Sequence, residues 1–416
     1  MELRRVVVTG LGALTPVGNT LQEYWDGLVS GRSGAVPITK FDAEKFKTRF
    51  ACEVKGFDPT AFIDRKEARK MDPFSQYAVV TADEAIRDSG LELEKEDRDQ
   101  IGVIWGSGIG GLQTFQDECF NFAKGDGTPR FNPFFIPKMI ADSASGLISM
   151  RHGLRGPSYV TVSACASSNN SMIDAFNYIR LGMCTAVVTG GSEAAINEAG
   201  VGGFNALHAM STRNDDPATA SRPYDLDRDG FVLGEGGAAI ILEDLEHARA
   251  RGARIYCEVI GGGMSSDAYH ITAPHPEGEG AFLCMRNALK DAGVGPEEID
   301  YINTHGTSTP IGDPQEVKAI QRLFGEHAYG LNISSTKSMT GHLLGAAGAI
   351  EAVASIMAVH HDTVPPTINH FTDDPEIDPK LNFTFNSAQK RTVNAALSNT
   401  FGFGGHNTSV IFRKLR

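Results

Sequence analysis

The feature that most constrains this 416-residue chain is a series of short apolar runs, each ending in a turn of glycine or other small residues. Runs of this length between turns predict strands that are buried on both faces of a sheet. Segments with helical spacing of apolar residues, such as 74–86 and 281–292, lie between several of the runs. This alternation predicts an α/β fold with a mostly buried sheet. The runs are Val6–Gly10, Ile101–Gly106, Ala186–Gly191, Ile255–Gly263 and Ile299–His305.

A weak internal echo indicates two related halves. A strand and a small-residue turn open a predicted helix over residues 159–179, and a similar strand, turn and Gly/Ala-rich helix occupy residues 332–358. Each is followed by a glycine-rich stretch that predicts a hairpin, at 229–242 in the first case and 398–412 in the second. The simplest interpretation is an internal repeat whose halves meet near Ala253. The expected units are residues 1–253 and 254–416.

The composition limits the classes of function. Lys and Arg number 38 against 51 Asp and Glu, and this acidic balance disfavours a nucleic-acid binder. No uninterrupted apolar run reaches the ~18 residues of a membrane span, so we expect no membrane insertion. The apolar segment 6–17 contains two glycines and a proline, which favours a strand and loop over a signal peptide. Six cysteines without a closely spaced pair suit a reducing compartment, and the expected location is the cytoplasm.

Three patterns imitate cofactor or metal sites and fail on inspection. The turn Gly10-Leu11-Gly12 follows a strand, but Thr15 stands at the third glycine position of a dinucleotide fingerprint. The aspartates at 225–229 imitate a calcium loop, but the required acid, Glu235, falls one place early. The adjacent pair His360-His361 cannot face one metal on a helix, because neighbouring residues point about 100° apart. We therefore expect no metal and no cofactor.

Cys165 is the candidate nucleophile. It lies in the sequence Ser163-Ala164-Cys165-Ala166, between a predicted strand and a predicted helix. At a helix N-terminus the macrodipole and free N–H groups favour a thiolate, and small neighbours admit a bulky electrophile. A lone free cysteine is more often inert packing. Its setting, rather than its identity, therefore indicates a catalytic role.

Two histidines are candidates for the same chemistry. His305 ends a predicted strand, so its imidazole is expected at the carboxyl edge of the sheet, where α/β sites form. His342 follows a small-residue loop and begins a predicted Gly/Ala-rich helix, whose N-terminus would lower the imidazole pKa. A neutral imidazole can donate an N–H to a carbonyl oxygen and act as an electrophile. The alternative for either histidine is a structural residue with satisfied hydrogen bonds.

Two further segments could complete a site. Lys337 lies in a small-residue loop between a strand and the predicted helix, and Glu351 inside that helix is its candidate charge partner. A surface lysine is the alternative. The glycine-rich segment Phe401–Asn407 predicts a mobile loop able to present backbone N–H groups to an oxyanion. A simple hairpin turn with a packed phenylalanine is the alternative there.

Together these segments resemble the β-ketoacyl-acyl-carrier-protein synthases, in particular the elongating type II enzymes of fatty acid synthesis. The resemblance runs from Val6 to Phe412 and rests on five separated motifs in the expected order, which is hard to obtain by chance. It implies an acyltransferase that joins an acyl group on its own cysteine to a decarboxylated malonyl unit on acyl carrier protein. The motifs are Ser163–Ala166, Asp229–Gly236, His305–Pro310, Lys337–His342 and Gly402–Gly405.

The resemblance also implies a fold and further site residues. The fold is the thiolase-like one, with two αβαβα halves in five layers and a homodimer as the assembly. Cys165 would come from the N-terminal half, and both histidines from the C-terminal half. Lys337 would support the histidines electrostatically, with Glu351 as its partner. The remaining implied roles are contacts with the phosphopantetheine arm by Thr307 and Thr309, gating of malonyl access by Phe403, and lining of the acyl tunnel by Ile109.

Two departures and two rivals qualify the resemblance. Ser163 stands where many relatives carry Thr, and His208 stands where some carry an arginine thought to meet the carrier protein. A thiolase is the nearest enzymatic rival, but no cysteine lies in the C-terminal glycine-rich loop as its Cys-His-Cys pattern requires. A non-catalytic chain-length partner subunit is the second rival, although such subunits lack the nucleophile that Cys165 supplies. Acyl length and a fatty acid or polyketide role stay open.

Docking of the carrier protein requires a local cationic face. Carriers of this pathway are acidic, and this chain has a net charge of −13, so a basic patch must offset the repulsion. The segment Arg65–Lys70 has the densest positive charge, and Lys66, Arg69 and Lys70 are the candidate docking residues, with Arg130 as a further candidate. A solvated helix face is the alternative.

Overall fold

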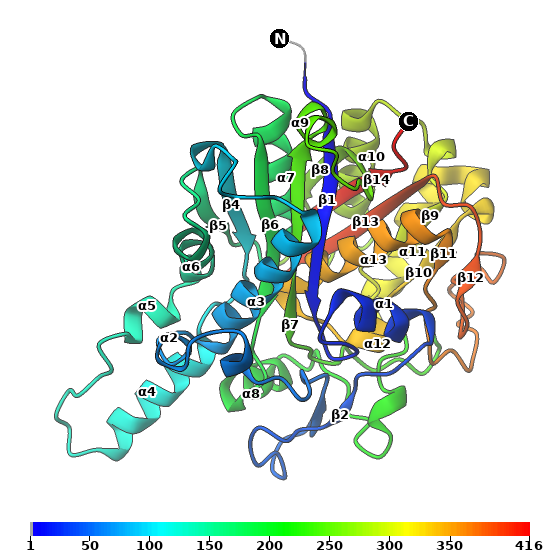
Figure 1. The fold of residues 1–416 in the computed structure, drawn as a ribbon. Coiled ribbons are helices and arrows are strands. Elements are labelled where there is room, and N and C mark those ends of the chain that lie inside the picture. Colours follow the sequence, from blue (N-terminus) through cyan, green and yellow to red (C-terminus); the bar gives the residue numbers. More distant parts are fainter. Residues whose placement is uncertain (1–2) are drawn as a thin grey trace.

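The computed structural model describes residues 3–416, and within them ten strands form one continuous sheet (Figure 1). Their order is β10-β9-β13-β14-β8-β1-β7-β6-β4-β5. Two-stranded ribbons, β2–β3 and β11–β12, lie outside it. The large sheet comprises β1 (Val6–Leu14), β4 (Ile101–Gly106), β5 (Ser158–Thr161), β6 (Ala186–Glu193), β7 (Gly236–Asp244), β8 (Cys257–Ser266), β9 (Tyr301–Asn303), β10 (Asn332–Ser334), β13 (Ala395–Gly402) and β14 (His406–Arg413). The ribbons comprise β2 (Val36–Pro37), β3 (Phe50–Ala51), β11 (Thr363–Val364) and β12 (Gln389–Lys390).

The sheet consists of two equivalent sets of five strands. In the first set β5, β4 and β6 are parallel, and β7 and β1 follow antiparallel. In the second set β10, β9 and β13 are parallel, and β14 and β8 follow antiparallel. The sets meet where Val6–Val8 of β1 pairs antiparallel with Cys257–Val259 of β8. This repeat is the two-half arrangement expected from the internal echo.

Helices complete five layers. One outer layer, on the first set of strands, contains α3 and α6; the other, on the second set, contains α10 and α11. Helices α7 and α13 contact each other and strands of both sets, so they form the middle layer. These six helices are α3 (Pro73–Ser89), α6 (Ser143–His152), α7 (Ser167–Arg180), α10 (Glu279–Ala292), α11 (Gly312–Phe324) and α13 (Ala347–His361). The others are α1 (Leu21–Val29), α2 (Arg65–Ala68), α4 (Leu112–Lys124), α5 (Phe135–Met139), α8 (Glu198–Ala206), α9 (Leu245–Ala250) and α12 (Lys337–Thr340).

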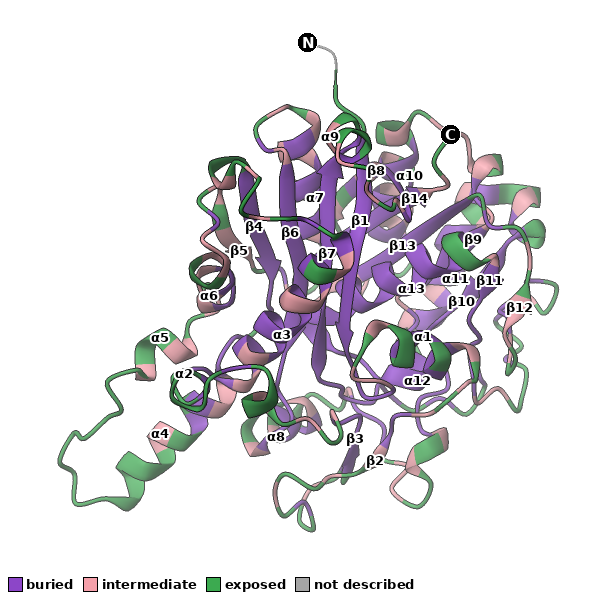
Figure 2. Cartoon of the chain, viewed as in Figure 1, coloured by how far each residue is buried: buried purple, intermediate pink, exposed green. Residues whose placement is uncertain are grey.

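The central strands and helix α13 of the middle layer are the most deeply buried parts of the described chain (Figure 2). Every residue of α13 from Ala347 to Val359 is buried, because its glycine and alanine residues allow close approach of the neighbouring layers. The stretch 344–361 is long and apolar enough to cross a membrane, but 89% of it is buried inside the protein. A buried core helix meets this criterion of length and apolarity as readily as a membrane span does, so the criterion is weak evidence for a membrane span here.

Two local expectations were wrong. The stretch 229–242 is not a hairpin: residues 229–235 form a loop, and β7 then pairs with β1 and β6. The loop forms isolated backbone bridges with separate segments, including Leu233 with His342, which a sequence pattern does not reveal. The helix expected to begin at His342 begins at Ala347, after a short 3₁₀ turn at Leu344–Ala346.

The end of β4 lies against the start of α7 in very close contact. A Cβ built on Gly106 would lie 2.5 Å from both the backbone N and the Cα of Ser168. Real atoms do not approach so closely, so only glycine permits this packing. The position of α7, and of the Cys165 segment before it, depends on this glycine.

We predict that Gly106→Ala lowers the free energy of unfolding by about 1–3 kcal/mol, the usual cost of overpacking a core. Urea denaturation followed by circular dichroism measures this change. Gly146→Ala is the control, because a Cβ on Gly146 in α6 meets no atom within 4 Å. Alanine is the better helix former, so Gly146→Ala should be neutral or stabilising. Equal stability of Gly106→Ala and the unsubstituted protein would contradict the prediction.

Candidate active site

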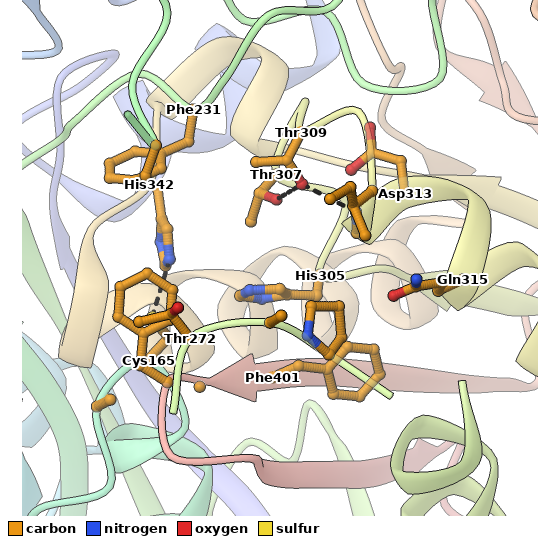
Figure 3. A pocket seen from close by; sticks show the side chains of 18 of the residues that line it. Cys165, Phe231, Thr272, His305, Thr307, Thr309, Asp313, Gln315, His342 and Phe401 are labelled. Carbon is orange, nitrogen blue, oxygen red and sulfur yellow. Dashed lines mark hydrogen bonds between the residues drawn. The ribbon is translucent and has the colours of Figure 1, made fainter. Parts of the chain in front are cut away.

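The predicted catalytic residues all follow the carboxyl ends of parallel strands. Cys165 follows β5, His305 follows β9, and Lys337 and His342 follow β10. The parallel strands of each half end at one edge of the sheet, and the layered packing brings the two edges together. Figure 3 shows Cys165, His305 and His342 directed into one cavity.

Cys165 lies two residues before α7, at its N-terminal end, as predicted. The preceding Ala164 has a φ of 51°, a left-handed conformation that is uncommon for a residue with a Cβ. The Sγ atom of Cys165 lies 3.1 Å from Nε2 of His342. The two halves of the chain therefore meet at a sulfur–imidazole contact.

The imidazole of His342 is held in one tautomer. Its backbone N–H donates to Val232 O at 2.7 Å, and its carbonyl accepts from Gly234 N at 2.9 Å. The Leu344 N–H donates to Nδ1 at 3.2 Å, so in the neutral ring the proton resides on Nε2, the atom that faces Cys165. Burial, followed by the charge of Lys337, lowers the pKa of His342 well below its usual value. The imidazole of His342 is therefore neutral, as expected, but through burial and the charge of Lys337 rather than through a helix N-terminus.

His305 faces the same space from β9. Its ring centroid lies 5.2 Å from that of His342, with the two planes nearly perpendicular. Burial lowers its pKa well below the usual value, with further effects of Lys337 and His342. Its Nδ1 has no hydrogen-bond partner among residues 3–416. A second neutral imidazole is thus available beside the sulfur.

Lys337 is buried rather than solvated. It has 1% of its surface exposed and forms an ion pair with Glu351 on α13, as predicted. Burial raises the pKa of Glu351 to about 7, and the Lys337 charge opposes that rise. Breaking a buried pair leaves an uncompensated charge, which is strongly destabilising. The ammonium lowers the pKa of Cys165, His305 and His342 together, so it acts on all three groups.

The electrostatics of Cys165 differ from the expectation of a ready thiolate. Burial raises the pKa of the thiol to about 12. Lys337 and the backbone N–H of Phe403, which donates to the sulfur, act in the opposite direction and do not compensate. The helix N-terminus alone therefore does not outweigh desolvation, and the resting group is a neutral thiol.

The cavity around these residues has a volume of about 600 Å³. The predicted substrate-binding residues Thr307, Thr309 and Ile109 all line it, as does Phe403. The hydroxyls of Thr307 and Thr309 lie 3.1 Å apart on one wall (Figure 3). His208, one of the departures from the family pattern, also lines the cavity. The segment of Phe403 is the tip of the β13–β14 hairpin, so the hairpin alternative describes its backbone.

The four predicted docking residues are exposed. Lys66 is on α2, Arg69 and Lys70 directly follow that helix, and Arg130 is in the connection between α4 and α5. Lys70 Nζ lies 5.7 Å from the ring centroid of Phe134 in the same connection. Lys70 thus lies beside the end of this connection at Phe134.

Several residues that sequence reasoning missed support the site. Phe231 packs edge-on against the imidazole of His342, with ring centroids 5.5 Å apart. The ring centroid of Phe401 lies 5.6 Å from the centroid of the His305 imidazole. The carboxylate of Glu316 accepts the backbone N–H groups of His305 and Gly306, each at 2.9 Å. Glu316 follows His305 by only 11 positions, beyond the end of the motif His305–Pro310, so its proximity along the chain was a usable signal. Phe231 lies in the motif Asp229–Gly236, but its contact with His342 depends on tertiary packing and could not be read from that motif.

The same three groups are close enough to hold a metal ion. The candidate ligand atoms of Cys165, His305 and His342 lie within 4.8 Å of one another. The buried ammonium of Lys337 acts on all three, and a second positive charge in this place is unfavourable. The residues present therefore suit a developing anion better than a cation.

Comparison with known proteins identifies the class. Residues 3–248 match the family Beta-ketoacyl synthase, N-terminal domain, and residues 256–371 match Beta-ketoacyl synthase, C-terminal domain. The 3-oxoacyl-[acyl-carrier-protein] synthase 2 of Synechocystis sp. is 52% identical over 414 residues, which cover 100% of this chain and 99% of that protein. The chain therefore belongs to the β-ketoacyl synthase family, and it is an enzyme of the acyltransferase class.

Solved structures confirm the thiolase-like fold expected from the resemblance. The ishigamide ketosynthase/chain length factor has a TM-score of 0.93 at 35% identity, with 100% of both chains covered. A structure of a type II PKS acyl-carrier protein in complex with its ketosynthase has a TM-score of 0.91 at 32% identity, also with 100% of both chains covered.

We predict that alkylation of Cys165 by iodoacetamide accelerates about tenfold per pH unit between about pH 7 and 9.5, because only the thiolate reacts. A thiol whose pKa is about 12 is far from full ionisation in that window. Peptide mapping by mass spectrometry measures the rate, and the partly exposed Cys119 in the same digest reports on reagent activity. A rate that levels off below pH 8 would show instead that the resting group is a thiolate.

Proposed function

We propose that this β-ketoacyl synthase elongates an acyl group held on Cys165 by decarboxylative condensation with malonyl-acyl carrier protein. The observation that carries the proposal is the contact of Cys165 Sγ with Nε2 of His342 at 3.1 Å, with His305 alongside. The relatives named 3-oxoacyl-[acyl-carrier-protein] synthase 2 support this reaction. The proposed division is a nucleophile-bearing half, 1–253, and a histidine-bearing half, 254–416.

The first half-reaction is acyl transfer. The sulfur of Cys165 attacks the thioester carbonyl of an acyl carrier, and the backbone N–H groups of Cys165 and Phe403 stabilise the oxyanion. The carrier sulfur leaves as a thiol, which takes up the proton lost by Cys165. Formation of the nucleophile is costly in the buried site, and the Nε2–H of His342 and the N–H of Phe403 reduce that cost.

The second half-reaction needs two neutral donors. Malonyl carrier enters when the loop of Phe403 opens, and its thioester oxygen accepts N–H bonds from His305 and His342. Carbon dioxide leaves as the enolate forms, and the enolate carbon attacks the acyl group on Cys165. The lowered pKa of both imidazoles supports donation from the neutral ring, and Lys337 adds a stabilising positive charge. No metal or redox cofactor takes part in these steps.

The rival of a non-catalytic chain-length subunit is less consistent with the site. One similar structure is titled as a ketosynthase/chain length factor, so fold similarity alone does not separate the two roles. This chain has the cysteine and both imidazoles together, and Lys337 is paired with Glu351 in the interior. The catalytic role is therefore the better supported one.

Acyl carrier protein is the proposed partner. One similar ketosynthase has been solved in complex with its acyl-carrier protein. The proposed docking face contains Lys66, Arg69 and Lys70, with Arg130 in the neighbouring connection. The expected cytoplasmic location fits the unpaired state of all six cysteines.

A homodimer is the proposed assembly. The arm formed by α4, residues 125–134 and α5 projects from the body (Figure 2) and exposes Phe115, Phe120, Phe122, Phe131 and Phe134. The rings of Phe131 and Phe135 stack with their centroids 5.5 Å apart, and this stacking leaves Phe131 exposed to solvent. Strand β5 is the edge of the large sheet, with open backbone groups able to pair with another strand. A second copy would cover both features.

We predict that Cys165→Gln abolishes condensation but leaves malonyl-carrier decarboxylation intact or increased, because the histidines remain. His305→Ala or His342→Ala should permit some acylation of Cys165 and depress decarboxylation by about 10²-fold, the scale of losing one oxyanion donor. Intact-mass measurement follows acylation, and released carbon dioxide follows decarboxylation. Thermal melting checks the fold of each variant, since a buried His→Ala can leave a cavity. Loss of both activities in folded Cys165→Gln, or normal decarboxylation in either histidine variant, would refute this division of roles.

We predict that reversing Lys66, Arg69 and Lys70 to Glu raises the apparent carrier KM about tenfold and leaves activity on a small thioester unchanged, because steering by charge is lost. Steady-state kinetics with both substrates measures the effect. The control reverses three exposed cations elsewhere, Lys95, Arg249 and Lys290, and changes net charge equally. An equal rise in KM for the control would remove the docking assignment.

A further inference from the structure

Glu193 is a fully buried carboxylate beside the reactive cysteine, at the end of β6, and no catalytic step above uses it. Among residues 3–416 it has no cationic partner in contact. Its oxygens instead accept four hydrogen bonds, from the N–H groups of Gly108 at 2.8 Å, Ile109 at 3.2 Å and Gly345 at 2.9 Å, and from the Ser107 hydroxyl at 3.2 Å. Burial raises its pKa to about 7, and these donors oppose the rise. A side chain buried at this cost and fully used as an acceptor indicates a specific role.

The four donors come from two segments that meet at Glu193 beside the cavity. Gly108 and Ile109 follow β4 and line the cavity, and we call them the acyl-binding wall after the tunnel role proposed for Ile109. Gly345 follows Leu344, another lining residue, which in turn donates its N–H to the imidazole of His342. One carboxylate therefore ties the acyl-binding wall to the short loop that orients His342.

The junction leaves no room for adjustment. A Cβ on Gly345 would lie 2.2 Å from Gly108 N and 2.6 Å from Glu193 Oε2. A Cβ on Gly108 would lie 3.0 Å from the same Oε2. The two glycines thus bring both backbones against one carboxylate, where a change in either wall reaches the other.

We propose that Glu193 is a positioning residue that holds the acyl-binding wall at Ile109 and the His342 loop in one fixed relation, and thereby helps to set which acyl chains are accepted. The inference rests on the proposed function. A long acyl chain presses on the Ile109 wall, and Glu193 keeps that wall from moving relative to Cys165 and His342. A short chain fills less of the cavity, whose volume is about 600 Å³, and therefore presses less on the wall.

Glu193→Gln tests the proposal, since one carboxylate oxygen becomes an NH₂ group that faces N–H donors and cannot accept. The measured quantity is the initial rate of Cys165 acylation by hexanoyl- and hexadecanoyl-acyl carrier protein, followed by intact mass. We expect the hexadecanoyl-to-hexanoyl rate ratio to change by about tenfold, because small misplacements in a site have large kinetic effects. The release of carbon dioxide from malonyl carrier should also fall, because the His342 loop loses its support.

Two further variants distinguish this role from general destabilisation. Glu84→Gln alters another carboxylate that accepts two backbone N–H groups, from Ala13 and Leu21, but does not line the Cys165 cavity. It should lower the melting temperature without changing the rate ratio. Ser107→Ala removes one hydrogen-bond donor to Glu193, and we expect it to change the rate ratio by about fivefold. If Glu193→Gln fails to fold, Ser107→Ala provides the decisive result.

The outcomes separate the two claims. A changed ratio in Glu193→Gln or Ser107→Ala, with an unchanged ratio in Glu84→Gln, supports the inference. An unchanged ratio in both Glu193→Gln and Ser107→Ala overturns it, as does an equal change in Glu84→Gln. Failure of the unsubstituted protein to acquire any acyl group on Cys165 would refute the proposed function itself.

Discussion

The close packing of α7 against α13 is the contact on which the active site depends. A Cβ on Gly348 would lie 2.5 Å from Oδ1 of Asn169, and the N–H of Ala349 donates to the Ser168 hydroxyl at 2.9 Å. Helices approach this closely only through small residues. The segments preceding the two helices contain Cys165 and His342, so this packing brings sulfur and imidazole together. Larger side chains at the contact would separate nucleophile and electrophile even with every catalytic residue present.

Burial is the main factor that determines the charge states of Cys165, His305 and His342. Desolvation raises the pKa of Cys165 and lowers that of both histidines, so the resting groups are neutral. The buried Lys337–Glu351 pair supplies a fixed field without a mobile counter-ion. A site of neutral donors and oriented backbone N–H groups reorganises little when negative charge develops on a thioester oxygen. This environment suits an enolate better than it suits a resting thiolate.

The two-half architecture explains how one chain performs two half-reactions in one cavity. Each half contributes the carboxyl ends of three parallel strands, which is where α/β folds place polar groups. The first half supplies Cys165 and the cavity wall at Ile109, and the second supplies both imidazoles. Glu193 and the backbone bridge between Leu233 and His342 connect the halves beside the site. The cavity wall at Ile109 and the loop of His342 therefore share structural supports.

The sequence by itself determined the α/β class, most strand positions and the identities of Cys165, His305, His342 and Lys337, because these depend on local periodicity and contiguous motifs. Ile101–Gly106 coincides with β4 for this reason. Only the tertiary structure decided the tautomer of His342, the raised pKa of Cys165 and the contacts of Phe231 and Glu193. These follow from desolvation and from contacts between segments far apart in the chain, such as Glu193 with Gly345, which lie 152 positions apart. Burial and distance are properties of the packed molecule, so no local pattern specifies them.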